Sequence, residues 1–354
     1  MLMLQTPNRE LREVRLSLGT DVHRFNGKTI VLTGGSGFLG RWFQSFFEYA
    51  NAEVLEVPCH VVAVDNHITG LPGEWREPVN GFVRLERDII QPLDIEGRVD
   101  FIIHAAGIAS PYYYRKYPLQ TLDVATQGTR NVLELARTKQ VEGLLYFSSS
   151  EIYGDPDARH VPTPESYRGN VSCIGPRACY DESKRIGETL CHVYHGMFGV
   201  RSRIVRPFNI YGPGMHASDF RVLPNFAARV LSRQPLHVYG AGGQTRTFCY
   251  VSDGLAGFLK VLLLGVPGEP YNIGNSSPEI SMLALARLIE RLRGEPIEIH
   301  PIEYPDAYPP DEPMRRCPDL TKARTQLAYE PRVDLEEGLH RFLEWASQHF
   351  ERNA

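Results

Sequence analysis

Residues 29–40, Thr-Ile-Val-Leu-Thr-Gly-Gly-Ser-Gly-Phe-Leu-Gly, decide the fold of this chain. The first five predict a buried strand, and a helix is expected over 38–49. Between them, Gly34, Gly37 and Gly40 follow the spacing Gly-x-x-Gly-x-x-Gly. Glycines at this place let the backbone turn tightly and let a pyrophosphate approach the helix N-terminus, whose N–H groups and dipole favour anions. The stretch therefore predicts a dinucleotide site.

A second apolar run, 60–64, ends at Asp65, and an acidic residue there bears on the choice of dinucleotide. Its carboxylate is expected to accept hydrogen bonds from an adenosine ribose and to repel a 2′-phosphate, which favours NAD over NADP. The alternative is that Asp65 is a plain turn residue before Asn66. Asp88, which follows 83–87, is a candidate for a contact with the adenine amino group.

The chain continues this pattern as an α/β fold. Apolar runs at 101–104, 143–147 and 202–205 predict further strands, and helical segments are expected near 119–139 and 181–197. Strands rich in Val, Ile and Leu that alternate with helices are typical of a Rossmann-like, doubly wound parallel sheet.

After Pro207 the density of glycine, proline and tyrosine rises, which predicts a smaller, irregular C-terminal lobe that binds substrate. Helices are expected in this lobe at 220–233, 252–265, 280–293 and 335–349. The segment 304–313 is too rich in proline to be a helix or a central strand. The expected division is an N-terminal extension, 1–26; an NAD-binding domain, 27–210, with returning segments near 244–275; and a mainly substrate-binding lobe, 211–350.

In the N-terminal extension, Leu11, Val14 and Leu18 have the spacing of one helix face. Two interpretations stay open, a short docking helix and a loosely attached leader. The first residues lack the apolar core and the small-residue cleavage site of a signal peptide, so we expect a cytoplasmic location.

Composition excludes several classes of protein. The 354 residues include 38 basic and 42 acidic side chains, a net charge of −4, so no overall positive field attracts nucleic acid or an anionic membrane. No apolar stretch reaches the roughly 20 residues of a membrane span. The six cysteines show no zinc-ligand spacing, which predicts free thiols in a reducing compartment and no metal site.

Tyr180 and Lys184 form the pattern Tyr-x-x-x-Lys, whose spacing places both side chains on one face of a helix. A tyrosine has a reference pKa of about 10, so a tyrosine base at pH 7 needs a shift of roughly 3 units, or about 4 kcal/mol. A nearby lysine stabilises the phenolate in that direction. The pattern occurs by chance on many helices, but here Ser148 to Gly154 also follow a predicted strand end, where ligands bind in parallel sheets.

On these residues the sequence resembles the extended short-chain dehydrogenase/reductase superfamily of nucleotide-sugar epimerases, dehydratases and decarboxylases. Within it, the chain resembles the UDP-glucuronate decarboxylases over about residues 28–340. The segment 174–182, Ile-Gly-Pro-Arg-Ala-Cys-Tyr-Asp-Glu, is the most specific match. The other matching segments are 34–40, 65–70, 109–111, 148–156, 169–185, 208–213, 243–251 and 316–319.

The resemblance implies an internal redox cycle on a UDP-sugar acid. Tyr180 takes the proton of the sugar 4-hydroxyl while NAD accepts hydride, and Lys184 lowers the Tyr180 pKa and holds the nicotinamide ribose. Carbon dioxide leaves from the resulting 4-keto acid, and the hydride then returns. By the same resemblance, Glu151 serves the carbon 5 end and Arg316 binds the hexuronate carboxylate.

The remaining roles also come from the resemblance. Ser149 and Ser150 would bond the sugar oxygens, Arg246 the diphosphate and Asn209 the substrate linker. A surface salt bridge for either arginine and a turn for Asn209 are the alternatives. Further expected cofactor contacts are Phe38, Leu39, Asn66, Ile89 and Ala105, and further expected substrate contacts are Ser110, Pro111, Tyr113, Val222 and Tyr239. The resemblance also implies a homodimer formed by two helices of each subunit.

Other functions remain open at this point. A UDP-uronate 4-epimerase would share the first oxidation, whereas a 4,6-dehydratase would be expected to carry an aspartate where this chain has Ser150. A non-catalytic sensor of NAD or nucleotide sugars is a third alternative. Intact Tyr180, Lys184 and Glu151 count against it, because a sensor does not need a matched base and cation.

Overall fold

A computed structural model describes residues 8–69, 81–219, 221–304 and 313–350. Its centre is a seven-stranded sheet in the order β11-β6-β5-β4-β1-β2-β3, in which all neighbouring strands are parallel. The strands are β1 (Thr29–Thr33), β2 (His60–Asp65), β3 (Phe82–Glu86), β4 (Phe101–His104), β5 (Gly143–Phe147), β6 (Ser202–Pro207) and β11 (Pro270–Ile273). The predicted α/β class with a doubly wound parallel sheet is confirmed.

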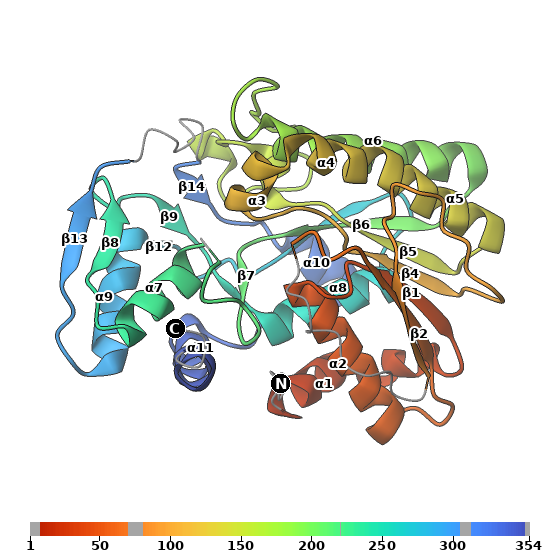
Figure 1. Ribbon diagram of the computed structural model, residues 1–354, viewed down its shortest axis with the longest axis horizontal. Coiled ribbons are helices and arrows are strands. Elements are labelled where there is room, and N and C mark those ends of the chain that lie inside the picture. Colours follow the sequence, from red (N-terminus) through yellow and green to blue (C-terminus); the bar gives the residue numbers. More distant parts are fainter. Residues whose placement is uncertain (1–7, 70–80, 220, 305–312, 351–354) are drawn as a thin grey trace.

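Helices cover both faces of this sheet (Figure 1). One face carries α1 (Asn8–Leu18), α2 (Phe38–Glu53) and α8 (Val251–Leu264). The opposite face carries α4 (Pro118–Asp123), α5 (Thr129–Lys139) and α6 (Ala178–Phe198), with a π-helical turn, Val124–Gly128, between α4 and α5. Because both faces are covered, all five residues of β5 are buried.

The chain returns to the central sheet after it has entered the smaller lobe. β11 lies at the sheet edge beside β6, with Tyr271 opposite Val205. Near the switch between the lobes, β10 (Cys249–Tyr250) pairs in parallel with β7 (Ile210–Tyr211). The two lobes are therefore built from interleaved parts of the sequence.

The smaller lobe has little regular sheet. β13 (Ile299–Ile302) pairs with β8 (Leu236–Tyr239), and β12 (Ile280–Ser281), β9 (Thr245–Arg246) and β14 (Arg315–Arg316) form a short three-stranded sheet. Its helices are α7 (Val222–Leu231), α9 (Met282–Arg293) and α11 (Leu335–His349). α10 (Thr321–Leu327) packs against β11 and α8 at the central sheet, and α3 (Pro111–Lys116) packs beside α4. Three of the helices predicted for this lobe are present in it as α7, α9 and α11, whereas the helix predicted at 252–265 is α8, which covers the central sheet. Most of the proline-rich segment, 305–312, lies outside the described residues.

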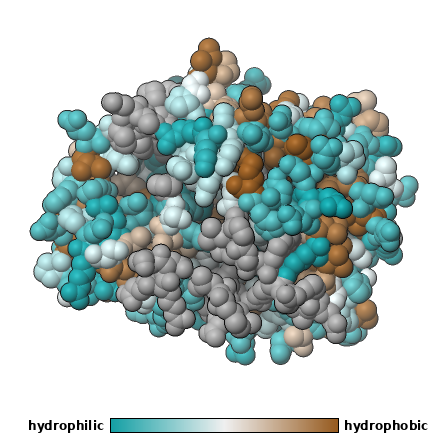
Figure 2. Space-filling view, viewed as in Figure 1, coloured by the Kyte–Doolittle hydropathy of each residue, from teal (hydrophilic) through white to brown (hydrophobic). Residues whose placement is uncertain are grey.

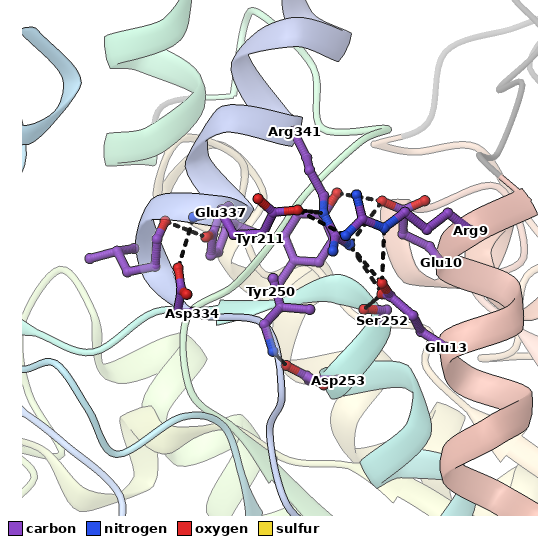
Figure 3. A network of polar contacts seen from close by, with 12 residues as sticks. Arg9, Glu10, Glu13, Tyr211, Tyr250, Ser252, Asp253, Asp334, Glu337 and Arg341 are labelled. Atoms are coloured by element: carbon purple, nitrogen blue, oxygen red, sulfur yellow. Dashed lines mark hydrogen bonds and ion pairs between the residues drawn. The ribbon is translucent and has the colours of Figure 1, made fainter. Parts of the chain in front are cut away.

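The N-terminal extension is a docked helix, as one of the two interpretations predicted. Leu11, Val14 and Leu18 are buried, and a 3₁₀-helix, Gly19–Phe25, continues from α1. Figure 3 shows how polar contacts tie α1 to α8 and α11. Glu10 accepts a hydrogen bond from Tyr250 at 2.9 Å, Glu13 accepts one from Ser252 at 2.8 Å, and Arg341 of α11 reaches both glutamates.

Membrane-spanning helices, metal sites and disulfides are absent from the described residues. None of their helices is long and apolar enough to cross a membrane. No group of histidine, cysteine and acidic side chains among them has the arrangement of a metal site. The six cysteines, which all lie in this part of the chain, form no disulfide.

Candidate active site

The glycine turn between β1 and α2 forms a close-packed cradle. Gly34 has φ +76°, and a Cβ at Gly40 would lie 2.1 Å from the carbonyl oxygen of Gly34, so a side chain is excluded there. α2 begins at Phe38 after Gly37, without a side-chain cap on its first N–H groups. The hydroxyl of Ser36 is buried in this turn and has no hydrogen-bond partner among the described residues. These features fit a diphosphate, which accepts hydrogen bonds from such groups.

Asp65 lies at the end of β2 beside this turn. Its two carboxylate oxygens accept the N–H groups of Ser36 and His67, both at 2.8 Å. Each oxygen can still accept a further hydrogen bond, so a ribose hydroxyl fits the same carboxylate. Next to it, the amide of Asn66 donates to Asp88 at 2.9 Å, which places these two predicted contacts together.

The other predicted cofactor contacts lie around the same strand ends. Phe38 and Leu39 form the first turn of α2, and Ala105 follows β4 with its carbonyl facing Gly34. Ile89 is buried against Gly128, where a Cβ would approach its side chain to 2.9 Å.

Tyr180 and Lys184 lie on the buried face of α6, with 6% and 7% of their surfaces exposed. The Nζ of Lys184 lies 5.7 Å from the Tyr180 ring centroid and donates to the carbonyl of Phe147, at the end of β5, at 2.9 Å. The ring of Tyr114 stacks on Tyr180 at 5.1 Å with an interplanar angle of 13°. The predicted shared face is therefore present and adjoins the carboxyl ends of the strands.

Burial shifts the pKa values of both Tyr180 and Lys184, and the pKa of Tyr180 is raised, not lowered as a base at pH 7 requires. Burial raises the pKa of Tyr180 to about 12, and a hydrogen bond with Ser149 and the charge of Arg221 partly offset it. Burial lowers the pKa of Lys184 to about 8. Lys184 is not among the groups that chiefly shift the Tyr180 pKa. Lowering of the Tyr180 pKa by Lys184 therefore stays a prediction.

The turn after β5 carries the predicted acid and its neighbours. Ser149 accepts the N–H of Glu151 and caps a short 3₁₀-helix, Ser150–Tyr153, in which Ser150 is buried. Glu151 forms ion pairs with two arginines, Arg177 and Arg316. Arg316, expected to hold a substrate carboxylate, thus contacts a carboxylate of the protein here.

Arg316 and Arg246 are direct neighbours on the paired strands β14 and β9. Arg246 is 7% exposed, and its guanidinium donates to the carbonyl oxygens of Thr245 and Met314. A guanidinium can pair bidentately with a phosphate or a carboxylate, so each of the two residues is a candidate for binding such a group.

A scan of protein families and searches of related proteins agree with this geometry. The model of the NAD dependent epimerase/dehydratase family matches residues 30–274. The chain belongs to this family. It is 40% identical over 329 residues to UDP-glucuronic acid decarboxylase 1 of Xenopus tropicalis, covering 92% of this chain and 74% of the relative. It is 41% identical over 313 residues to UDP-glucuronic acid decarboxylase 5 of Arabidopsis thaliana, covering 88% and 86%.

A solved structure of the same fold is UDP-glucuronic acid 4-epimerase from Bacillus cereus in complex with UDP-glucuronic acid and NAD. It is 26% identical to this chain, with a TM-score of 0.73, and the match covers 90% of this chain and 99% of that one. The suspected relationship to nucleotide-sugar epimerases, dehydratases and decarboxylases is confirmed.

Within this epimerase/dehydratase fold, the remaining predicted substrate contacts lie at α3, α7 and β8. Ser110 and Pro111 begin α3, and Tyr113 of that helix packs in the same apolar cluster as Tyr180. Val222 begins α7. Tyr239, at the end of β8, stacks on Tyr304 at 5.6 Å.

Asn209 lies in a turn, which was the alternative to a substrate contact for this residue. It adopts φ +44°, and its amide donates to the carbonyl of Thr247 at 2.7 Å. Its side chain therefore stabilises the turn before β7. The predicted contact of Asn209 with a substrate linker is not tested by this geometry and stays a prediction.

Several residues of the site were not predicted from the sequence. Tyr114, Arg177, Asp181 and Arg221 all act on Tyr180 or Glu151 in the structure. The i, i+4 spacing of Arg177 and Asp181 around Tyr180 was a signal that could have found that pair. The partners of the other two lie too far along the chain for any local pattern to indicate them.

Proposed function

We propose that the protein decarboxylates UDP-glucuronate to UDP-xylose, with NAD as its cofactor. The observation that carries the proposal is the arrangement around Tyr180, where the buried Tyr–Lys pair lies beside the partly buried ion pair of Glu151 and Arg316. A redox base and a carboxylate-binding arginine are the two groups that oxidation of a sugar acid followed by loss of carbon dioxide needs. The UDP-glucuronic acid decarboxylases at about 40% identity support the same substrate.

The glycine turn, the buried Ser36 hydroxyl and Asp65 fit NAD. In this assignment the turn and the first N–H groups of α2 hold the pyrophosphate, and Asp65 holds the adenosine ribose. When bound, NAD would supply the hydride acceptor and donor for carbon 4. Residues 27–210 are the NAD-binding domain in this proposal, and 211–350 are mainly the substrate-binding lobe.

The protein's own residues do the proton chemistry and the binding. Tyr180 accepts the proton of the 4-hydroxyl, and the ammonium of Lys184 stabilises the phenolate and orients the nicotinamide ribose. The ketone that forms at carbon 4 is β to the carboxylate, so the C–C bond breaks to carbon dioxide and an enolate. Glu151 serves carbon 5 directly or through water as that carbon regains a proton. Tyr180 returns its proton to the 4-oxygen at the end of the cycle.

The other residues bind and orient the sugar nucleotide. Arg316 forks onto the hexuronate carboxylate, and Arg246 contacts the diphosphate, because a guanidinium matches both groups bidentately. Ser149 and Ser150 bond the sugar oxygens.

The test of this function is product identification with purified protein, NAD and UDP-glucuronate. We expect UDP-xylose as the sugar nucleotide in the product. UDP-galacturonate in its place would contradict the proposal and favour a 4-epimerase. That alternative is supported by the fold shared with the Bacillus cereus UDP-glucuronic acid 4-epimerase.

We propose a homodimer that forms through α4 and α6. Exposed apolar side chains follow one another along α6 at Ile186, Val193 and Met197, and Leu119 of the adjacent α4 is 70% exposed. Figure 2 shows apolar, brown residues between polar, teal ones along the upper part of the molecule, over the helices of this face. An apolar row of this kind is typical of a surface that a partner covers.

We also propose a cytoplasmic location. The six cysteines are unpaired thiols, which suit a reducing compartment. Fractionation of cells is the direct check, and enrichment of the protein outside the cytoplasm would contradict it.

A further inference from the structure

Four charged side chains form a compact cluster beside Tyr180. Glu151 comes from the turn after β5, Arg177 and Asp181 from the start of α6, and Arg316 from β14. Their side chains are 15%, 7%, 9% and 11% exposed, in that order. Two carboxylates and two guanidiniums balance each other in charge, which allows ionised groups to stay this deeply buried.

One oxygen of Glu151 is shared by both arginines. Nη2 of Arg316 donates to Oε2 of Glu151 at 2.7 Å, and Nη2 of Arg177 donates to the same oxygen. If Arg316 binds the substrate carboxylate, that carboxylate and Glu151 compete for one guanidinium. Glu151 must then remain in the site with less support from Arg316.

Arg177 is fixed in a way that lets it supply that support. Its Nε lies 3.4 Å from Oδ2 of Asp181, one helical turn further along α6. Its backbone carbonyl accepts the N–H groups of Tyr180 at 2.8 Å and of Asp181 at 3.0 Å. Arg177 therefore links Glu151 to the helix that carries the proposed base.

Asp181 influences how strongly Arg177 is drawn to Glu151. Burial and the nearby charge of Glu151 raise the pKa of Asp181 to about 7, while Arg177 and Arg316 partly offset them. When Asp181 is ionised, Arg177 divides its charge between two carboxylates. When Asp181 is protonated, Arg177 faces the charge of Glu151 alone.

We propose that Arg177 is a positioning residue, which retains Glu151 in the site while Arg316 exchanges Glu151 for the carboxylate of the substrate. Asp181 is the counter-anion that holds Arg177 in place for this exchange. The inference rests on the proposed function, because a substrate without a carboxylate gives Arg316 no reason to leave Glu151.

The test compares the affinities of two ligands, UDP-glucuronate and UDP-glucose, which differ in the carboxylate. All variants carry Tyr180→Phe, so that no turnover disturbs calorimetry of the holoprotein. In Arg177→Met, Glu151 keeps Arg316 more strongly. We therefore expect UDP-glucuronate to bind about tenfold more weakly, roughly 1.4 kcal/mol, while the affinity for UDP-glucose stays within about twofold.

The matched control is Arg287→Met. Arg287 lies on α9, is 61% exposed and pairs with Glu290 at 2.9 Å, so it also loses a carboxylate partner but far from the cluster. Neither affinity should change in it. Arg177→Lys keeps the charge but cannot hold two carboxylates as a fork, and we expect it to recover part of the loss.

A second arm removes the competing charge. Glu151→Gln should bind UDP-glucuronate about threefold or more tightly than the parent, and in the double variant it should cancel the effect of Arg177→Met. Unchanged UDP-glucuronate affinity in Glu151→Gln contradicts the competition, even if Arg177→Met does not fold.

Other outcomes separate this inference from the proposed function. Equal losses for both ligands in Arg177→Met mean that Arg177 only supports the fold, and no loss for either means that it does not retain Glu151. A parent protein that binds UDP-glucose as tightly as UDP-glucuronate overturns the proposed substrate itself, whatever Arg177 does.

Discussion

Tyr180 contributes a single reacting atom, its phenol oxygen. Tyr180→Phe should lower kcat for UDP-glucuronate by about 10³-fold or more, because it removes the group that accepts and returns the 4-hydroxyl proton. Phe keeps the ring that stacks on Tyr114, so the melting temperature should stay within a few degrees. Product assays and thermal unfolding check both. Tyr112→Phe, at a tyrosine that is 42% exposed, is the control. A loss smaller than tenfold would remove Tyr180 from the chemistry.

Lys184 makes stability depend on pH with a definite sign. Burial lowers its pKa from 10.5 to about 8, so below pH 8 it is protonated in both the folded and the unfolded chain. Between these pKa values the unfolded chain binds the proton and the folded one does not, so Lys184 makes the folded state more stable as pH rises.

The corresponding prediction concerns Lys184→Met. From pH 7.5 to 9.5, the free energy of unfolding of the wild type should rise relative to that of the variant by about 2 kcal/mol, since one unit of pKa shift corresponds to about 1.4 kcal/mol. Urea unfolding at the two pH values measures the difference. A difference that does not change with pH would show that Lys184 keeps an ordinary pKa in the folded chain.

Asp65 should decide the choice between NAD and NADP. Asp65→Asn removes the negative charge and keeps one of the two oxygens that accept the N–H groups of Ser36 and His67. We expect the ratio of NADP affinity to NAD affinity to rise about tenfold, because the repulsion of a 2′-phosphate is lost. Titration of cofactor-depleted protein gives both constants, and an unchanged ratio would assign Asp65 to the turn alone.

At the scale of elements, α1 belongs to the folded core. Leu11 is 4% exposed, whereas Leu16 on the same helix is 60% exposed. Leu11→Ala should lower the free energy of unfolding by about 2–5 kcal/mol, and Leu16→Ala should change it by less than about 0.5 kcal/mol. Denaturant unfolding of the pair measures this, and equal effects would show that α1 is only loosely attached.

Elements with local signals could be predicted from the sequence. The strand, glycine turn and helix over 29–49 lie where their pattern places them, and so do α8 and α11 within two residues. The two-residue strands β9 and β14 could not be predicted, because their pairing depends on tertiary contacts between segments about 70 residues apart.

In the candidate site, too, residues with a local sequence signal could be predicted and long-range contacts could not. Tyr180 and Lys184 were found because both lie in one helical repeat. The Glu151 cluster was not found as a unit, because its ion pairs join residues 26 and 165 positions apart. The Tyr180 pKa could not be inferred either, since burial dominates it and burial is a property of the folded chain.

For the whole molecule, subunit association is open to a direct test. Light scattering should give twice the 40.0 kDa mass of the chain. Met197→Glu places a charge in the proposed α6 contact and should yield monomers, whereas Leu16→Glu, on the opposite face of the sheet, should not. A wild-type monomer, or a dimer that persists in Met197→Glu, would contradict this interface.

The net charge of −4 also has a consequence at this scale. NAD and a UDP-sugar acid are both polyanions, and a mildly acidic protein binds them through local groups. The structure places Arg246 and Arg316 side by side, and the N-terminus of α2 follows the glycine turn. In the proposed function, these two places bind the charged groups of the two ligands.

The central claim is loss of the sugar carboxylate, and its most direct measurement follows that carbon. UDP-glucuronate labelled at carbon 6 is incubated with the protein, and label in carbon dioxide is compared with label in the sugar nucleotide. The account predicts labelled carbon dioxide in a one-to-one ratio with unlabelled UDP-xylose. Label retained entirely in a UDP-uronate would contradict it.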